Sequence, residues 1–158
     1  QLSNKDLEGV DRKTPEKPAE VSPDNPEAAR AYNEAYKKFE EENFPEAIRM
    51  LNEFASKYTA HVYADNAVYW VGESYFRMRD FVKAAEQFER VAIAFPTGNK
   101  VPDALLRAAS CYLRLNRPAD AQKTFERIIQ TYPQSIAATK ARASLAEISG
   151  TGSGERRM

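Results

Sequence analysis

Apolar side chains in the middle of this chain recur with the period of an amphipathic helix. Between residues 81 and 95 they form one stripe, composed of Phe81, Ala84, Ala85, Phe88, Val91, Ala92 and Phe95. A similar stripe follows at Ala121, Phe125, Ile128 and Tyr132. A spacing of three or four residues is typical of a helix that buries one face. The pattern therefore predicts an all-α protein.

Prolines mark where these helices begin and end. Pro96 and Pro133 stop the stretches before them, because proline lacks the backbone N–H and clashes with the preceding turn. Three further prolines suit the first turn of a helix: Pro26, Pro102 and Pro118.

Polar caps complete the boundaries. Asp80 is a good N-cap for a helix that starts at Phe81, and Asn43 with Glu46 has the spacing of a capping box. The predicted helices span residues 26–42, 44–58, 62–79, 81–95, 101–115, 118–132 and 135–149.

The chain also repeats itself at a spacing of 37 residues, and a fixed period of this size is typical of a solenoid. In each unit a small residue precedes an alanine by twelve positions, which gives the set Ala35, Ala47, Gly72, Ala84, Ala109 and Ala121. We expect paired helices to approach most closely at these positions, since larger side chains would separate them.

Small residue, alanine, aromatic and terminal proline together form the tetratricopeptide repeat (TPR) pattern. We expect a TPR solenoid of three helix-turn-helix repeats at about 26–58, 62–95 and 101–132, closed by a capping helix at 135–149. The period is longer than the usual value of about 34. Repeat one also departs from the pattern, with Lys38 at the aromatic position.

Composition limits the possible functions. Residues 1–25 are rich in proline and charge and predict a disordered linker, while the Gly- and Ser-rich residues 150–158 predict a flexible tail. Lys+Arg and Asp+Glu balance at 23 each, which disfavours nucleic-acid binding. The sequence has no apolar run of membrane-spanning length, so we expect no membrane insertion.

One stretch is more specific than a generic repeat. Residues 67–75, Ala-Val-Tyr-Trp-Val-Gly-Glu-Ser-Tyr, resemble the Ala-x-Tyr-Trp-x-Gly-Glu-x-Tyr signature of the periplasmic Tol–Pal-associated TPR proteins, the YbgF/CpoB family. The resemblance covers residues 27–149. It implies a periplasmic adaptor whose partners are TolA and the peptidoglycan synthase machinery, and which coordinates envelope constriction with peptidoglycan synthesis during cell division.

This sequence also departs from the family. Members carry an N-terminal coiled coil that trimerises them, and residues 1–25 contain no heptads. Outer-membrane assembly lipoproteins share the long period and the Tyr-Pro endings. The alternative function is therefore a TPR subunit of an outer-membrane or pilus assembly complex. A third possibility is an accessory domain of an enzyme.

TPR arrays bind partners mainly on the concave face, which the first helix of each repeat lines. The register places these side chains there: Tyr36, Asn66, Tyr69, Glu73, Arg77, Asp103, Arg107, Ser110 and Arg114, with Tyr32 and Leu106 beside them. Tyr69 is the strongest candidate, because a tyrosine covers apolar surface and still forms hydrogen bonds. Its alternative role is to pack between neighbouring helices.

Arg77, Arg107 and Arg114 could form a basic strip that binds a partner's carboxylate. Alternatively they pair within the chain, with Glu73 or Asp103, and the four-residue spacing of Glu73 and Arg77 permits a local pair.

Three other residues favour structural roles. We expect Trp70, the sole tryptophan, to be buried between repeats one and two. We expect Cys111 to be a small buried apolar residue. His61 has no second histidine or cysteine nearby in the sequence, so a metal site is not expected. The sequence contains no phosphate-binding loop, Gly-x-Ser-x-Gly or His-Glu-x-x-His motif, so we expect neither catalysis nor a cofactor.

Overall fold

The computed structural model describes residues 25–155, and within that range the regular secondary structure consists of α-helices, without strands. The seven described helices are α2 (Pro26–Glu40), α3 (Phe44–Lys57), α4 (Ala64–Arg77), α5 (Phe81–Ala94), α6 (Val101–Arg114), α7 (Pro118–Thr131) and α8 (Ile136–Glu155). Apart from the end of α8, each boundary lies within two residues of the one predicted.

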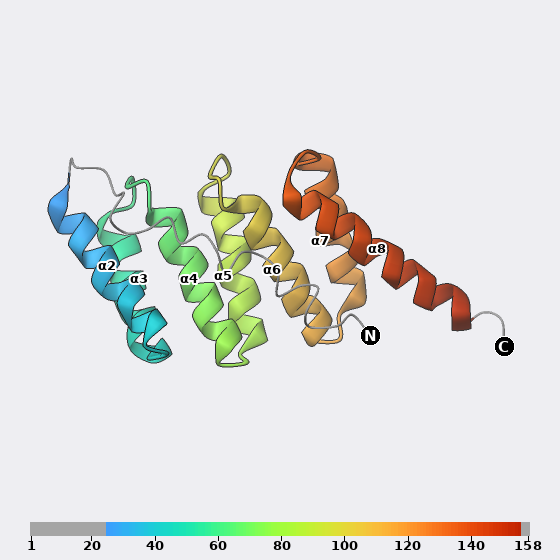
Figure 1. Ribbon diagram of the computed structural model, residues 1–158, viewed down its shortest axis with the longest axis horizontal. Coiled ribbons are helices and arrows are strands. Elements are labelled where there is room, and N and C mark those ends of the chain that lie inside the picture. Colours follow the sequence, from blue (N-terminus) through green and yellow to red (C-terminus); the bar gives the residue numbers. More distant parts are fainter. Residues whose placement is uncertain (1–24, 156–158) are drawn as a thin grey trace.

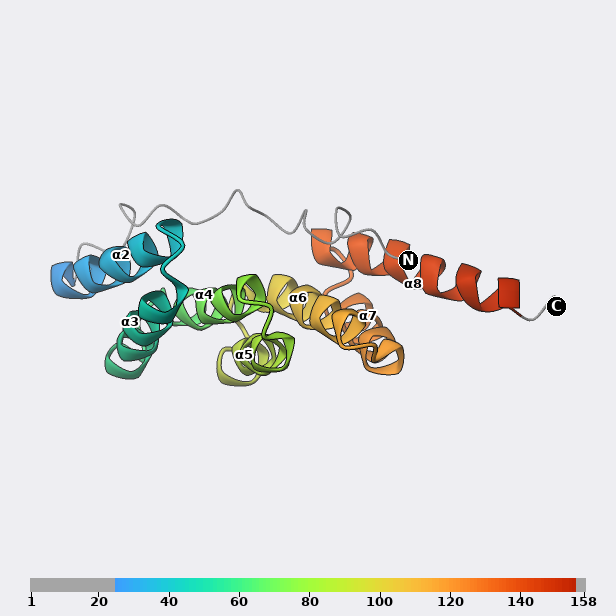
Figure 2. The same cartoon turned by 90° about the horizontal axis from the view of Figure 1, so that it is seen from below.

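The helices stack side by side in the order of the sequence (Figure 1). Each helix packs mainly against the one before it and the one after it. Figure 2 shows α2, α4, α6 and α8 along one side of the array, and α3, α5 and α7 along the other. The first row lies on the inner side of the array's curve.

The turns inside the three helix pairs share one backbone conformation. Glu42, Arg79 and Asn116 have φ of 60°, 63° and 55°, the left-handed region that non-glycine residues rarely adopt. In each turn this residue donates its N–H to a carbonyl three positions back, and the next residue donates to one five back. These bonds satisfy carbonyls that the helix end would otherwise leave unpaired.

The structure confirms the predicted side-chain caps of the helices only in part. Asp80 accepts the N–H of Lys83 at 3.2 Å, as predicted, and Asn25 caps α2 by accepting the N–H of Ala28 at 3.0 Å. The predicted capping box is wrong: the side chain of Asn43 makes no cap bond. The Glu46 carboxylate instead binds Arg49 one turn further along α3, which removes it from the N-terminus.

Helix α8 ends at Glu155 and not at residue 149. Glycine and serine weaken a helix by at most about 1 kcal/mol each, and proline, the residue that would stop it, does not occur after Pro133. The predicted tail at 150–158 is therefore helical as far as Glu155. Residues 156–158 and all of the predicted linker except Asn25 lie outside the described residues.

Small residues allow the helices to approach closely. The predicted contact alanines Ala35, Ala47, Ala84, Ala109 and Ala121 are all fully buried. At Gly72 on α4, an added Cβ would lie 2.7 Å from the nearest ring atom of Phe88 on α5. Only a residue without a side chain lets α4 and the Phe88 ring adopt these positions.

We predict that Gly72→Leu lowers the free energy of unfolding by about 1–3 kcal/mol, because the added side chain overpacks the α4–α5 contact. Chemical denaturation followed by circular dichroism measures the change. Gly150→Leu is the matched control, because an added Cβ at Gly150 meets nothing within 4 Å. Equal stability of the two variants would contradict the close contact.

His61, between α3 and α4, provides a pH-dependent contribution to stability. Its Nδ1 accepts the backbone N–H of Tyr63 at 3.1 Å, its ring packs on Phe54, and its Nε2 has no hydrogen-bond partner among residues 25–155. Burial lowers the pKa of His61 below its ordinary value. The folded chain therefore holds the neutral ring, and the unfolded chain takes up a proton more readily.

We predict that His61 makes its full contribution to the free energy of unfolding above about pH 6.5, and that this contribution is lost as the pH falls below that value. Melting temperatures of the wild type and of His61→Gln, measured between pH 8 and pH 5, test this. The wild type should lose more stability on acidification than the variant. Parallel losses would assign the acid sensitivity to other groups.

Candidate protein-binding surface

The residues predicted to line the concave groove lie on the inner row of helices, but most of them are buried. Six are less than 9% exposed: Tyr36, Asn66, Tyr69, Glu73, Arg107 and Ser110. Asp103 and Arg114 are half-buried, and Arg77 is exposed. For these six residues the expectation of a side chain open to a partner is wrong, because they are buried. The same holds for Tyr32 and Leu106, which are 1% and 0% exposed.

The tyrosines are buried because they belong to an aromatic core. Tyr36 packs edge-on against Trp70 at 5.1 Å between ring centroids, and Phe39 contacts the same indole at 4.9 Å. Tyr69 lies between Trp70 and Phe88, at 5.4 and 5.5 Å. Burial accordingly raises the pKa of Tyr36 to about 12. Trp70 thus fills the space between α2 and α4, in agreement with the predicted position between repeats one and two.

Glu73 on α4 and Arg107 on α6 form a buried ion pair across the two inner helices. Arg107 Nε donates to one carboxylate oxygen at 2.5 Å and Nη2 donates to the other at 3.0 Å, with side chains only 6% and 11% exposed. Burial opposes the charge of Arg107, but attraction by Glu73 outweighs it and raises the pKa of the guanidinium. Removing one partner of such a pair leaves the other charge buried without a counter-ion, which destabilises the fold.

The local pair that the four-residue spacing of Glu73 and Arg77 permits does not form; the alternative of pairing within the chain holds for Arg107, which binds Glu73. Arg77 instead contacts Glu42 at 3.4 Å and lies over the ring of Phe44, at the exposed end of α4. Glu73 is turned toward α6, where Arg107 reaches both of its oxygens. Glu73 and Arg107 are 34 positions apart, so helical spacing alone could not identify this pair.

Three arginines surround two phenylalanine rings at the α4–α5 turn and the adjoining part of α6. Phe76 and Phe81 pack edge to face at 5.1 Å. The guanidinium carbon of Arg107 lies 4.0 Å from the Phe76 centroid, that of Arg114 5.5 Å from Phe81, and that of Arg79 5.7 Å from Phe81. We call these five residues the arginine–phenylalanine cluster.

The arginine–phenylalanine cluster carries excess positive charge. Glu73 neutralises Arg107, whereas within residues 25–155 neither Arg79 nor Arg114 forms an ion pair. Met78 on the same turn and Val82 in the first turn of α5 are 46% and 53% exposed. A stacked guanidinium keeps its edge N–H groups available for a carboxylate, and stacking restricts its motion. The arrangement suits an acidic segment with apolar side chains.

Sequence reasoning identified Arg107 and Arg114 but missed Arg79, Phe76 and Phe81 as surface residues. The predicted helix at 62–79 includes Arg79, whereas in the structure α4 ends at Arg77 and Arg79 lies in the turn that follows. A usable signal was present, since Arg77 and Arg79 fall between two phenylalanines in Phe76–Phe81. Their convergence with α6 depends on how the repeats stack.

The remaining candidates have structural roles. Cys111 is fully buried, and burial raises the pKa of its thiol to about 12. Across residues 25–155, no group of three His, Cys, Asp or Glu side chains could hold a metal ion. None of the helices in this range is long and apolar enough to cross a membrane.

Comparisons with known proteins agree with this architecture. A search of curated proteins found no match. Among solved structures, the type III secretion translocator chaperone SycD of Yersinia enterocolitica has a similar fold, with a TM-score of 0.62. The two chains are 17% identical, and the match covers 79% of this chain and 93% of SycD.

Two family models, both described as tetratricopeptide repeat, match the sequence. One matches residues 18–117 and the other residues 103–135. The first spans more than half of the chain and includes both members of the Glu73–Arg107 pair. The chain belongs to the tetratricopeptide repeat family.

Proposed function

We propose that this protein is a non-enzymatic adaptor that binds a partner protein, and that the arginine–phenylalanine cluster receives an acidic segment of that partner. The observation that carries the proposal is the position of Arg79 and Arg114 around Phe81. Both cations are held in place by an aromatic ring and lack an intramolecular carboxylate among the described residues.

Several contacts prepare this surface before a partner arrives. The left-handed backbone of Arg79 is fixed by the turn hydrogen bonds that follow α4. The Glu73–Arg107 pair holds Arg107 against Phe76 from the buried side. Because these groups lose little freedom on binding, a partner carboxylate gains affinity that a flexible surface arginine would not provide.

We also propose that the adaptor acts in the periplasm, with a TolA-like partner, to coordinate envelope constriction and peptidoglycan synthesis during division. The proposal is supported by the resemblance of residues 67–75 to the Tol–Pal-associated family. These residues lie on α4, where Tyr69, Trp70 and Gly72 pack in the core. The signature thus shapes the scaffold that presents Phe76 and the turn after it.

We predict that replacing Arg79 and Arg114 together by glutamine abolishes partner binding at ordinary concentrations. Truncating an arginine that is a hot spot of an interface costs at least about 2 kcal/mol of binding free energy, roughly thirtyfold in affinity for each such residue. Pull-down from an envelope extract with the full chain identifies the partner, which should include a TolA-like protein. Calorimetric titration then compares the wild type and the variant against that partner.

Arg30→Gln is the control, because Arg30 is an exposed arginine on α2, outside the cluster. It should bind like the wild type, and circular dichroism should show unchanged helicity in both variants. Undiminished binding by the double variant would exclude the cluster as the binding site. Recovery of a partner other than a TolA-like protein would contradict the Tol–Pal assignment and leave the adaptor function intact.

A further inference from the structure

One face of α2, at the N-terminal end of the described array, corresponds to the face that a preceding helix covers on α4, α6 and α8. Helix α3 covers α4, α5 covers α6, and α7 covers α8. In the part of the chain that the structure describes, no helix precedes α2. The corresponding face of α2 therefore lacks, within that part, the neighbour for which the repeat geometry leaves room.

Register shows how this face differs from its equivalents. At the 37-residue spacing, positions 27, 31 and 34 of α2 match 64, 68 and 71 of α4 and 101, 105 and 108 of α6. The six residues on α4 and α6 are apolar and at most 1% exposed: Ala64, Val68, Val71, Val101, Leu105 and Ala108. On α2 the same stripe reads Glu27, Ala31 and Glu34, an acidic version of a helix-packing surface.

A groove of about 240 Å³ lies between α2 and α3 at this end. Ala31, Met50 and Tyr58 contribute its half-buried apolar part, whereas Glu34 and Glu53 are exposed at its edge. We call it the α2–α3 groove. Its volume can hold one or two apolar side chains of a bound segment, since a buried methylene or methyl group occupies only a small fraction of it.

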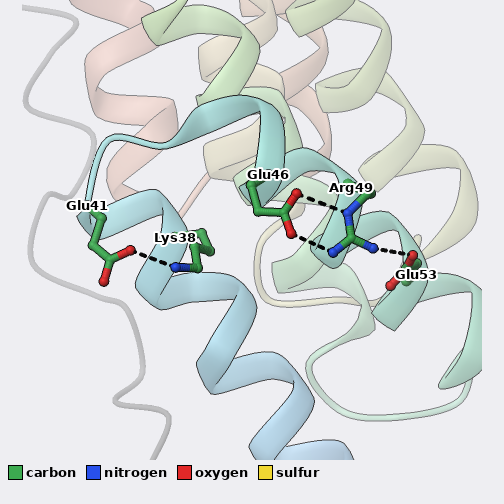
Figure 3. A network of polar contacts seen from close by, with 5 residues as sticks. All are labelled: Lys38, Glu41, Glu46, Arg49 and Glu53. Carbon is green, nitrogen blue, oxygen red and sulfur yellow. Dashed lines mark hydrogen bonds and ion pairs between the residues drawn. The ribbon is translucent and has the colours of Figure 1, made fainter.

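The carboxylates around the α2–α3 groove outnumber the cations. Figure 3 shows Arg49 between Glu46 and Glu53, and it binds both. Lys57 binds Glu27 at 3.1 Å. The side chain of Glu34 is exposed and forms no ion pair or hydrogen bond within residues 25–155. The groove thus combines an apolar centre, a net negative edge and one carboxylate without a side-chain partner in that range.

We propose that the α2–α3 groove binds a basic amphipathic helix of a partner polypeptide. The helix would occupy the position that α3 takes on α4 and α5 takes on α6. Its apolar residues would contact Ala31 and Met50, and a lysine or arginine would pair with Glu34. This surface is separate from the arginine–phenylalanine cluster and prefers the opposite charge, so one adaptor could hold two partners.

Self-association is a weaker explanation for this face. An apolar stripe at positions 27, 31 and 34 would let solenoid ends stack on one another, and polar outer faces on terminal repeats prevent this. Glu27 and Glu34 therefore disfavour binding of a neutral apolar surface, because their carboxylates would be buried without a partner, and they favour binding of a cationic one. Charge complementarity identifies the occupant as basic.

The probe for the test is a labelled helical peptide of about 18 residues with leucine at i, i+3, i+4 and i+7 and lysine elsewhere. Its counterpart carries glutamate in place of lysine. Fluorescence anisotropy at low salt measures both peptides against the full chain. We expect the lysine peptide to bind and the glutamate peptide to bind at least about tenfold more weakly.

Glu34→Lys should weaken binding of the lysine peptide by at least about tenfold, and Met50→Gln should weaken it several-fold. Glu86→Lys is the matched control, because Glu86 is an exposed glutamate on α5, outside the groove. Glu34 is exposed, so its replacement leaves the fold intact, and circular dichroism verifies this. Equal weakening by Glu34→Lys and Glu86→Lys, or no weakening by Glu34→Lys, would overturn the proposal.

Sedimentation of the peptide-free protein distinguishes the other occupant. We expect a monomer whose mass does not change in Glu34→Lys. An oligomer that dissociates in Glu34→Lys would assign the groove to a second copy of the chain and overturn the proposal of a partner helix. These tests of the α2–α3 groove do not depend on the proposed function, because the peptide-binding and sedimentation results would stand even if the arginine–phenylalanine cluster bound no partner.

Discussion

Close approach between consecutive helices is the constraint on which the array depends. The contact of Gly72 with the Phe88 ring leaves no room for a Cβ, and fully buried alanines occupy the corresponding positions in the other pairs. This contact fixes the separation of α4 and α5, and with it the position of the turn that carries Arg79. A surface built from three elements keeps its geometry only if those elements cannot slide.

Local chemistry made most of the fold predictable. Proline positions, the Asp80 cap and the apolar stripes depend on neighbours within one or two turns, so they can be read from the sequence. The groove was less predictable, because burial depends on how separate helices stack. Tyr36 and Tyr69 had the right register for a concave face, but packing on Trp70 placed them in the core. Likewise, Glu73 pairs with Arg107 on another helix.

The two proposed surfaces divide the charge of a neutral chain. Arg79 and Arg114 give positive charge to the arginine–phenylalanine cluster, while Glu34 gives negative charge to the N-terminal end. Each charge lies next to apolar side chains, Met78 and Val82 in one case and Met50 in the other. A protein with no net charge can thus select partners by local sign, and long-range attraction contributes little.

The sequential packing of the helices also determines how the chain folds. Because each helix contacts mainly its immediate neighbours in sequence, the mean sequence separation between contacting residues is small. Chains of low contact order search few long loops and fold rapidly. In such a one-dimensional array, interior pairs have neighbours on both sides and terminal helices have only one. Amide hydrogens of the interior helices α4, α5 and α6 will therefore exchange most slowly, and the ends of the solenoid will open first.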